Sequence, residues 1–410
     1  MCVAADGSGR VRGLRLRAGG GTLPRHAPRP RPLGGERAAR PRPRVSAPSA
    51  TSAAYATLSA FGARGFRAVP SDVGCASSGG DDKVDVYLVK FAGADGATVP
   101  LCASGACGSF LLVDATFAGR GYASPEEGLR TVVTHELFHA VQNAYAVDAD
   151  PFWAEGTAQW AMKSVHPADQ DFERHLAPFF AEPTRSIDAP PGGVTAGFLY
   201  GAAVWPLFLS LRLGPEVVRE VLERGADGSS ALVATEAVLA GRGTSLAHEY
   251  PFFAAWNAAT GKLAGTGGYP DAAAYPGLKT VAALEDGAGA ISSGLGYFAY
   301  RGVLDRRLQV SLEGDPARNG GVLVPFEGGR PALERAAELP ATGEGEVLVV
   351  VSGTTSRKTD APFTIRVGPP VAPGSETAVD DGCRVGRSGG TTAPSLLALG
   401  VLALVRRRRR

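Results

Sequence analysis

Two histidines and a glutamate in the run His135-Glu136-Leu137-Phe138-His139 have the types and spacing to bind and use a metal ion. Four residues is about one helical turn, so both imidazoles would share a helix face and present two nitrogens to one ion. Glu136 would then lie beside a water at that ion and take its proton. The pattern predicts a zinc site with a general base. Two solvated histidines on a surface helix are the alternative.

The residues around this run predict the helix that must carry it. Ser124-Pro125-Glu126-Glu127 combines an N-cap serine, a proline at the first helical position and a glutamate at the third, which is a capping box. The apolar residues that follow recur at helical spacing: Leu129, Val132, Val133, Leu137, Phe138 and Val141. Upstream, residues 84–89 and 110–113 are β-rich, so we expect the helix to pack beside a small sheet.

A third protein ligand is expected, because catalytic zinc sites generally take three and leave one position open. Six positions after His139, where a metzincin has its third histidine, the chain has Tyr145, which excludes that arrangement. Asp150-Pro151 predicts a second helix start, and this helix carries Glu155, sixteen residues after His139. That distance allows a loop and a return helix. Glu155 is the predicted third ligand, and an ordinary surface carboxylate is the alternative.

The His135 to His139 run, followed by Trp153-Ala154-Glu155-Gly156-Thr157-Ala158-Gln159-Trp160, resembles the gluzincin metalloproteases, the broad thermolysin-like clan. Within it, the chain is most similar to the MXAN-type family of bacterial surface metalloproteases. The resemblance implies that His135, His139 and Glu155 hold Zn²⁺, that Glu136 is the general base, and that proteins or peptides are the substrates. The chain departs from the thermolysin-like pattern in two ways. The gap between His139 and Glu155 is shorter, and Gln159 stands four residues after Glu155, where thermolysin-like enzymes often have aspartate.

Hydrolysis also needs a donor for the charge that develops on the carbonyl oxygen. The gluzincin resemblance implies a tyrosine or histidine from a later helix, and Tyr200, His175 and His248 are the candidates. We favour Tyr200 because its small neighbours would let a substrate approach its hydroxyl, with a buried core tyrosine as the alternative. Asp148 and Gln159 are available to hydrogen-bond the histidine ligands.

Beyond the zinc helices the sequence pattern changes twice. Residues 196–261 are helical in pattern and are expected to form the lower subdomain and one wall of the cleft. After residue 290, short β-rich runs separated by turn residues predict a compact β-sandwich, similar to the pre-peptidase C-terminal and jelly-roll domains of secreted bacterial proteases. The expected fold class is an α+β zincin-like metalloprotease domain (49–265), a linker (266–285) and an all-β sandwich accessory domain (286–368).

The C-terminal end carries a three-part pattern. Residues 369–392 are a predicted linker with Cys383, and residues 393–410 combine a short apolar segment with five arginines. The apolar segment is shorter than the roughly twenty residues of a spanning helix. The order of cysteine, apolar segment and basic cluster resembles the myxobacterial C-terminal sorting tail (MYXO-CTERM), which implies export, membrane attachment at the cell surface (outer membrane), or secretion. A plain tail anchor is the alternative.

Residues 1–48 are a predicted basic, Arg/Pro-rich lead, either disordered or preceding the true start codon. The first 45 residues hold eleven arginines against two acids and no apolar run of a secretory signal. A basic arm can bind nucleic acid. Because the chain between this lead and the terminal arginines is acidic, we expect no nucleic-acid partner.

Three of the five cysteines lie in the body of the chain: Cys75, Cys102 and Cys107. Cys102 and Cys107 are disulfide candidates because their bond would close a tight loop before the β-rich run at residue 110, and Cys75 paired with either is also allowed. A cysteine zinc site is not expected, since no second C-x-x-C pair is present.

Two functions of different class follow from these patterns. The first is an extracytoplasmic zinc endopeptidase, acting as a monomer, in which Glu136 activates water for peptide hydrolysis. The second is a surface adhesin or binding protein that keeps a protease-like scaffold without turnover. Zinc content and the effect of Glu136→Gln on cleavage distinguish them.

Overall fold

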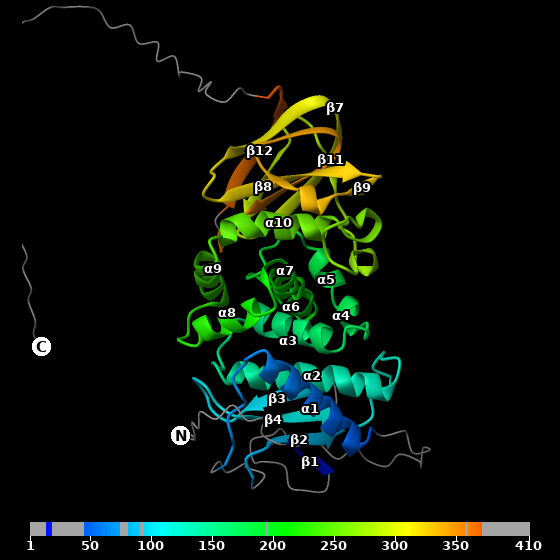
Figure 1. Ribbon diagram of the computed structural model, residues 1–410, viewed down its shortest axis with the longest axis vertical. Helices are drawn as coiled ribbons and strands as arrows, with labels where there is room; N and C mark the ends of the chain where they lie inside the picture. Colours follow the sequence, from blue (N-terminus) through cyan, green and yellow to red (C-terminus); the bar gives the residue numbers. More distant parts are fainter. Residues whose placement is uncertain are drawn as a thin grey trace, which may run out of the picture. The chain divides into compact units, whose positions relative to one another are not determined.

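The computed structural model describes residues 14–18, 45–73, 81–90, 94–117, 119–193, 196–356 and 360–370 (Figure 1). This part of the chain is a mixed α+β protein with a small sheet, a set of helices and a larger, mainly antiparallel sheet. The mixed fold class is thereby confirmed. The predictions for Cys75, for Cys383 and for the apolar and basic C-terminal segment lie outside the described residues.

Ten α-helices and twelve β-strands form within these residues. The helices are α1 (Ala47–Ala63), α2 (Pro125–Asn143), α3 (Pro151–Val165), α4 (Asp171–Arg174), α5 (Ala177–Phe180), α6 (Ala196–Gly201), α7 (Val204–Leu213), α8 (Val217–Gly225), α9 (Ala231–Gly241) and α10 (Leu246–Ala258). The strands are β1 (Leu14–Ala18), β2 (Val84–Val89), β3 (Gly96–Pro100), β4 (Ser109–Asp114), β5 (Ala282–Ala283), β6 (Gly289–Ser293), β7 (Tyr297–Gly314), β8 (Asn319–Glu327), β9 (Arg330–Pro331), β10 (Ala337–Glu338), β11 (Ala341–Gly353) and β12 (Asp360–Gly368).

The small sheet has the strand order β1-β2-β4-β3, with β3 antiparallel at one edge and the other pairs parallel. The two predicted strands are confirmed as β2 and β4. The sheet also includes β1, so residues 14–18 of the expected lead pair with β2. Helix α2 lies against β3 and β4, and α1 packs on α2, as Figure 1 shows in blue and cyan.

Helix α2 begins as the capping pattern predicts. The Ser124 hydroxyl accepts a hydrogen bond from the Glu127 amide at 3.1 Å, and the Glu127 carboxylate accepts one from the Ala123 amide at 3.0 Å. His135 and Glu136 are each only 7% exposed, because α2 lies between the sheet, α1 and α3. The alternative of solvated histidines on a surface helix is therefore wrong.

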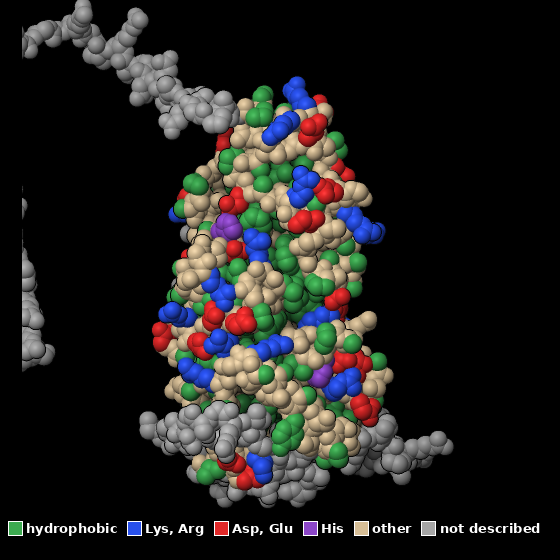
Figure 2. Space-filling model, in the orientation of Figure 1, with side chains coloured by type: hydrophobic (Ala, Val, Ile, Leu, Met, Phe, Trp, Pro, Cys, Tyr) green, Lys and Arg blue, Asp and Glu red, His purple; other side chains and the backbone are tan. Residues whose placement is uncertain are grey.

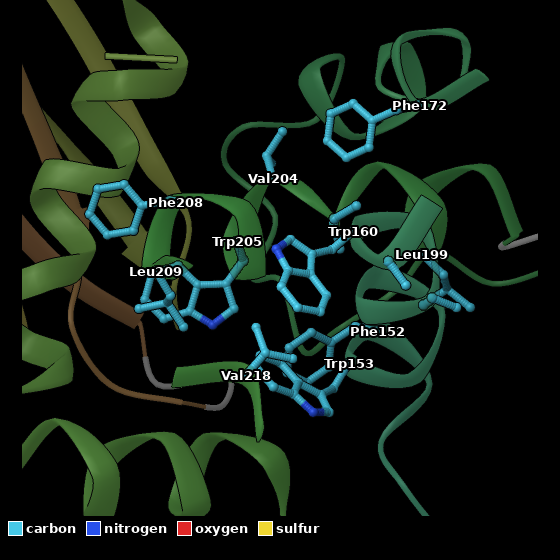
Figure 3. Packing of buried hydrophobic residues seen from close by; sticks show 14 of the residues in the cluster. Phe152, Trp153, Trp160, Phe172, Leu199, Val204, Trp205, Phe208, Leu209 and Val218 are labelled. Atoms are coloured by element: carbon cyan, nitrogen blue, oxygen red, sulfur yellow. The ribbon is translucent and has the colours of Figure 1, made fainter. Parts of the chain in front are cut away.

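Helix α3 is held in place by its aromatic residues and by one glycine. Trp153 and Trp160 belong to a large buried cluster that also contains Trp205 of α7 (Figure 3). A Cβ on Gly156 would lie 3.3 Å from the Ala203 backbone nitrogen, so glycine permits the close packing of α3 on the α6–α7 turn. Glu155, the neighbour of Gly156, is thereby held on a rigid element.

The predicted N-cap of α3 is correct in position but not in its contact. Asp150 is the N-cap residue, yet its side chain does not bond to the α3 amides. Its Oδ2 instead accepts a hydrogen bond at 2.6 Å from the Ala231 amide, at the first residue of α9. One carboxylate thus joins the start of α3 to the start of α9.

The predicted helical region is confirmed as α6 to α10. Pro206 lies in the first turn of α7, where the missing amide costs no helical hydrogen bond. Among the described residues, the segment Ala196–Leu213 is long and apolar enough to cross a membrane. Over half of that stretch, 56%, is buried inside the protein, so packing in a core accounts for its apolar character.

The large sheet has the order β10-β8-β11-β7-β12-β6, with β5 and β9 paired to β7 and β8. Its strands are hydrogen-bonded into one sheet, whereas the predicted sandwich would have two. One set of buried residues packs against α10 and shares the hydrophobic cluster of the helices. A second cluster is formed by the sheet's own strands and includes Tyr300, Val349 and Phe363.

On the face of the molecule seen in Figure 2, acidic and basic side chains are interspersed.

Candidate metal centre

Two helices bring His135, His139 and Glu155 together. The Nε2 atoms of the two histidines are 3.0 Å apart, and Glu155 Oε2 lies 3.2 Å from His135 Nε2 and 3.4 Å from His139 Nε2. In the described part of the chain, these three residues form the group of His, Cys, Asp and Glu side chains that can hold a metal ion, with ligand atoms within 4.8 Å of one another. The structure thus joins the three predicted ligands.

The chemistry and spacing of these three atoms fit zinc. Ligands at the 2.0–2.1 Å distances of tetrahedral zinc are separated from each other by about 3.3 Å, and the three observed separations of 3.0, 3.2 and 3.4 Å bracket this value. Two imidazoles and one carboxylate are also a set that zinc accepts in catalytic sites. The residues can therefore hold such an ion without rearrangement of either helix.

Gln142 fixes the orientation of His139. The His139 Nδ1–H donates to Gln142 Oε1 at 2.8 Å, while Gln142 Nε2 donates to the Ala154 carbonyl at 2.8 Å and to the Thr157 hydroxyl at 2.6 Å. The carbonyl determines which end of the amide faces the histidine. When His139 is neutral, this contact would keep its proton on Nδ1 and leave the Nε2 lone pair directed at the cluster, as a metal ligand requires.

The charges of the cluster prepare it for a cation. Burial acts to lower the pKa of His139, but the hydrogen bond and charge of Glu155, the charge of Glu136 and the hydrogen bond with Gln142 together raise it to about 9. For Glu155, burial acts to raise the pKa, and the two histidines hold it well below its usual range. The carboxylate therefore stays ionised, and a cation that binds here displaces a proton from His139.

Glu136 lies beside the cluster and against the edge strand. The Thr98 hydroxyl of β3 is 2.7 Å from both the Glu136 carboxylate and its backbone carbonyl, so it donates to one of them. A Cβ on Gly96 would lie 2.6 Å from Val132 and 2.8 Å from the Glu136 side chain, which only glycine avoids. The first residue of β3 thus allows this strand to approach the helix at the carboxylate.

Tyr200 is the predicted oxyanion donor that the structure places nearest to the ligands. Its ring centroid is 5.6 Å from that of His135 and 5.2 Å from that of His175. Burial, and then the charges of Glu155 and Glu136, raise the Tyr200 pKa well above its usual value, so the hydroxyl stays protonated. His248 lies on α10, where it contacts Thr244, Glu249 and Phe252, away from the cluster.

Two adjoining cavities border the cluster. One cavity of about 400 Å³ is lined by β3, the two histidines, Glu155 and the loop before α3. A second cavity of about 500 Å³ is lined by the start of β3, one face of α2 and α3, and α4. Gly96, His135, Glu136 and Tyr200 line both cavities. The candidate base and donor therefore lie where the two cavities meet.

Other predicted site residues have different roles from those expected. Gln159 and Asp148 line cavities near the cluster, but neither hydrogen-bonds a histidine ligand within the described chain. Gln142 does so, and sequence analysis missed it, although its spacing of three residues from His139 puts both on one helix face. Cys102 and Cys107 form the predicted disulfide.

The disulfide loop supports the turn that follows α2. The Cys107 amide donates to the Asn143 carbonyl at 2.8 Å, and the Val147 amide donates to the Gly105 carbonyl at 3.2 Å. These two bonds connect the closed loop to the segment between the two metal-bearing helices.

The fold and the site together define a mixed α+β protein with a His, His, Glu cluster that can hold a metal ion, set in a cleft. No family model matches the chain, and no curated protein matches its sequence.

Proposed function

We propose that this protein is an extracytoplasmic zinc-dependent endopeptidase of the gluzincin type. The observation that supports it most directly is the convergence of His135, His139 and Glu155 from two helices, with the carboxylate of Glu136 beside them in an open cleft. When bound, zinc would supply a Lewis acid that polarises the scissile carbonyl and lowers the pKa of water. The remaining steps depend on side chains of this chain.

Glu136 is suited to hold and move the proton in this reaction. It faces both cavities, and the Thr98 hydroxyl restrains it. It would take a proton from the attacking water and pass it to the leaving amine. Tyr200, protonated at neutral pH, would donate a hydrogen bond to the carbonyl oxygen as negative charge develops there.

Strand β3 is suited to orient a peptide. It is the edge strand of the small sheet, with a sheet neighbour on one side, and its residues line the cleft. An extended peptide can add to such an edge through main-chain hydrogen bonds. This geometry favours a polypeptide substrate over a small ester or amide, and two adjoining cavities at Glu136 offer room for residues beyond the scissile bond, as an endopeptidase needs.

The test is cleavage of casein by the zinc-loaded full-length protein and by its Glu136→Gln variant. We expect the wild type to cleave and the variant to lose at least 100-fold in rate while it still binds zinc, because glutamine cannot accept the proton. Equal cleavage by both proteins would refute the role of Glu136. Zinc binding with no cleavage of any peptide by the wild type would favour the surface binding protein instead.

A further inference from the structure

The two cavities beside the cluster differ in charge. Apart from the ligands and Glu136, the 400 Å³ cavity is lined by neutral residues. The 500 Å³ cavity adds Asp95, Arg120, Asp171 and His175. Its lining therefore holds three carboxylates, counting Glu136, against one guanidinium.

The charged groups of the second cavity are already arranged by their neighbours. Asp95 accepts from the Tyr122 hydroxyl at 2.9 Å and pairs with Arg120 at 3.1 Å, and Arg120 also reaches Asp114 at 3.4 Å. Asp171, with a side chain 4% exposed, pairs with Arg174 at 2.8 Å and lies 3.5 Å from His175. Each lining aspartate thus has a guanidinium partner, and among the described residues Glu136 is the lining carboxylate that adds negative charge without one.

Two buried polar side chains in the same cavity have atoms without a partner in the described chain. Thr131 is 2% exposed and Gln159 is 3% exposed, and neither Thr131 Oγ1 nor Gln159 Oε1 has a hydrogen bond. Each lies one helical turn from a predicted ligand, Thr131 before His135 on α2 and Gln159 after Glu155 on α3. Both residues line this cavity. Buried polar atoms without partners are uncommon, and a bound group that donates hydrogen bonds would satisfy them.

We propose that the cavity lined by Thr131, Gln159, Asp95 and Asp171 is the specificity subsite of the proposed peptidase and takes a lysine or arginine side chain next to the scissile bond. A basic side chain supplies donors for the Thr131 and Gln159 oxygens and a positive charge beside Glu136. The volume of about 500 Å³ admits a long side chain. This inference rests on the proposed function, because a specificity subsite requires a peptidase. The preference for a basic side chain can nevertheless be measured as binding, without cleavage.

Other side chains fit the lining less well. An acidic side chain would lie beside Glu136, Asp95 and Asp171, and the two guanidiniums that offset the aspartates, Arg120 and Arg174, are already held in ion pairs with them. A large apolar side chain would leave the Thr131 hydroxyl and the Gln159 carbonyl oxygen without a hydrogen-bond partner, whereas a donor would supply one. Specificity of this kind arises from the polar groups that the wrong side chain leaves unpaired.

The test compares the binding of peptides that differ in one side chain. Acetylated alanine hexapeptides with one internal lysine, norleucine or glutamate are titrated into the zinc-loaded Glu136→Gln full-length protein by calorimetry, so that peptide is not consumed. Lysine and norleucine share the alkyl chain and differ in the ammonium group. We expect the lysine peptide to bind about 10-fold tighter than the norleucine peptide and tighter still than the glutamate peptide. Equal or reversed affinities would overturn the proposal.

Two substitutions assign the preference to this cavity. Thr131→Val and Gln159→Leu, each made in the Glu136→Gln protein, should each reduce the lysine advantage at least threefold and leave the norleucine affinity unchanged. Because Thr131 Oγ1 and Gln159 Oε1 have no partner in the described part of the chain, both variants are expected to fold, and thermal unfolding checks this. Thr235→Val is the matched control, since Thr235 is buried in α9 and bonds only to its own helix at Ala231. An unchanged lysine advantage in both variants would refute the subsite.

Cleavage by the wild type separates this inference from the proposed function. Cleavage of a mixed peptide library without preference for bonds next to lysine or arginine would contradict the subsite and leave the peptidase intact. Tight lysine binding without cleavage of any peptide would contradict the peptidase and leave the subsite intact.

Discussion

Gln142 connects the two metal-bearing helices through one side chain, so its replacement tests how the site is held. Its Oε1 orients His139, and its Nε2 bonds to the Ala154 carbonyl and the Thr157 hydroxyl on α3. Because Gln142 is only 3% exposed, water cannot replace these contacts when they are removed. We therefore expect Gln142→Leu to weaken both the zinc affinity and the packing of α2 on α3.

The size of each effect follows from the contacts. Loss of a partner that orients a metal-bound histidine weakens metal affinity about 10–100-fold, which corresponds to roughly 1.4–2.7 kcal/mol. Three hydrogen bonds of about 0.5–1.5 kcal/mol each are removed, and the added apolar side chain offsets part of this. The free energy of unfolding of the metal-free protein should fall by about 1–3 kcal/mol. Gln142→Glu keeps the acceptor for His139 but places a carboxylate against the Ala154 carbonyl, so it should retain zinc affinity and still lose stability.

Zinc affinity is measured by competition with a chromophoric chelator, and stability by urea unfolding after metal removal. Gln159→Leu is the control, since it makes the same chemical change one turn from Glu155 without touching a predicted ligand. Zinc affinity of Gln142→Leu within twofold of the wild type would refute the role assigned to Gln142. Equal loss in the Gln159→Leu control would show that the effect is not specific to the His139 contact.

Three further changes test the surroundings of the site. Gly96→Ala should lower the rate of peptide cleavage and cost about 1–3 kcal/mol of stability, because a Cβ would clash with Val132 and Glu136. Gly192→Ala is the control, because the space around its Cβ position is open. Stability is measured for both variants by chemical denaturation. Asp114→Asn should lower the free energy of unfolding at pH 7. Burial acts to raise the Asp114 pKa, but hydrogen bonds from Thr116 and Phe117 and the charge of Arg120 together hold it below its usual value. A depressed folded-state pKa stabilises the protein above the unfolded-state pKa, so the difference from wild type should be constant above about pH 4 and shrink below it in urea titrations. Phe138→Ala should cost about 3–5 kcal/mol in the same assay, because this fully buried ring packs on three other aromatic side chains.

Much of the candidate site was predictable because its determinants are local in sequence. The His135 to His139 spacing and the Ser124 cap predict a helix that carries two ligands, and the structure has that helix. Glu155 follows from the start of a second helix at a reachable distance. In each case a short-range pattern determines which face a side chain occupies.

What could not be predicted depends on contacts between distant segments. Strand β3 contains a glycine and a proline and has no clear alternation, and its place beside α2 depends on the space that Gly96 leaves for Val132. Strand β1 is a five-residue Leu/Arg alternation within a composition that suggested disorder. Thr98 and Glu136 are separated by 38 residues in the sequence, so no local pattern predicts their contact. Whether the β-rich runs make one sheet or two depends likewise on strand pairing across long connections.

The most direct test of the metal centre is the zinc content of the purified full-length protein and of its ligand variants. After dialysis against excess zinc and then buffer, the wild type should retain about one zinc per chain by elemental analysis. His139→Ala and Glu155→Gln should each retain well under a tenth of that while circular dichroism shows the wild-type helix content. Zinc retained equally by the wild type and both variants, or absent from a wild type that is folded, would contradict the assignment of His135, His139 and Glu155 as a metal site.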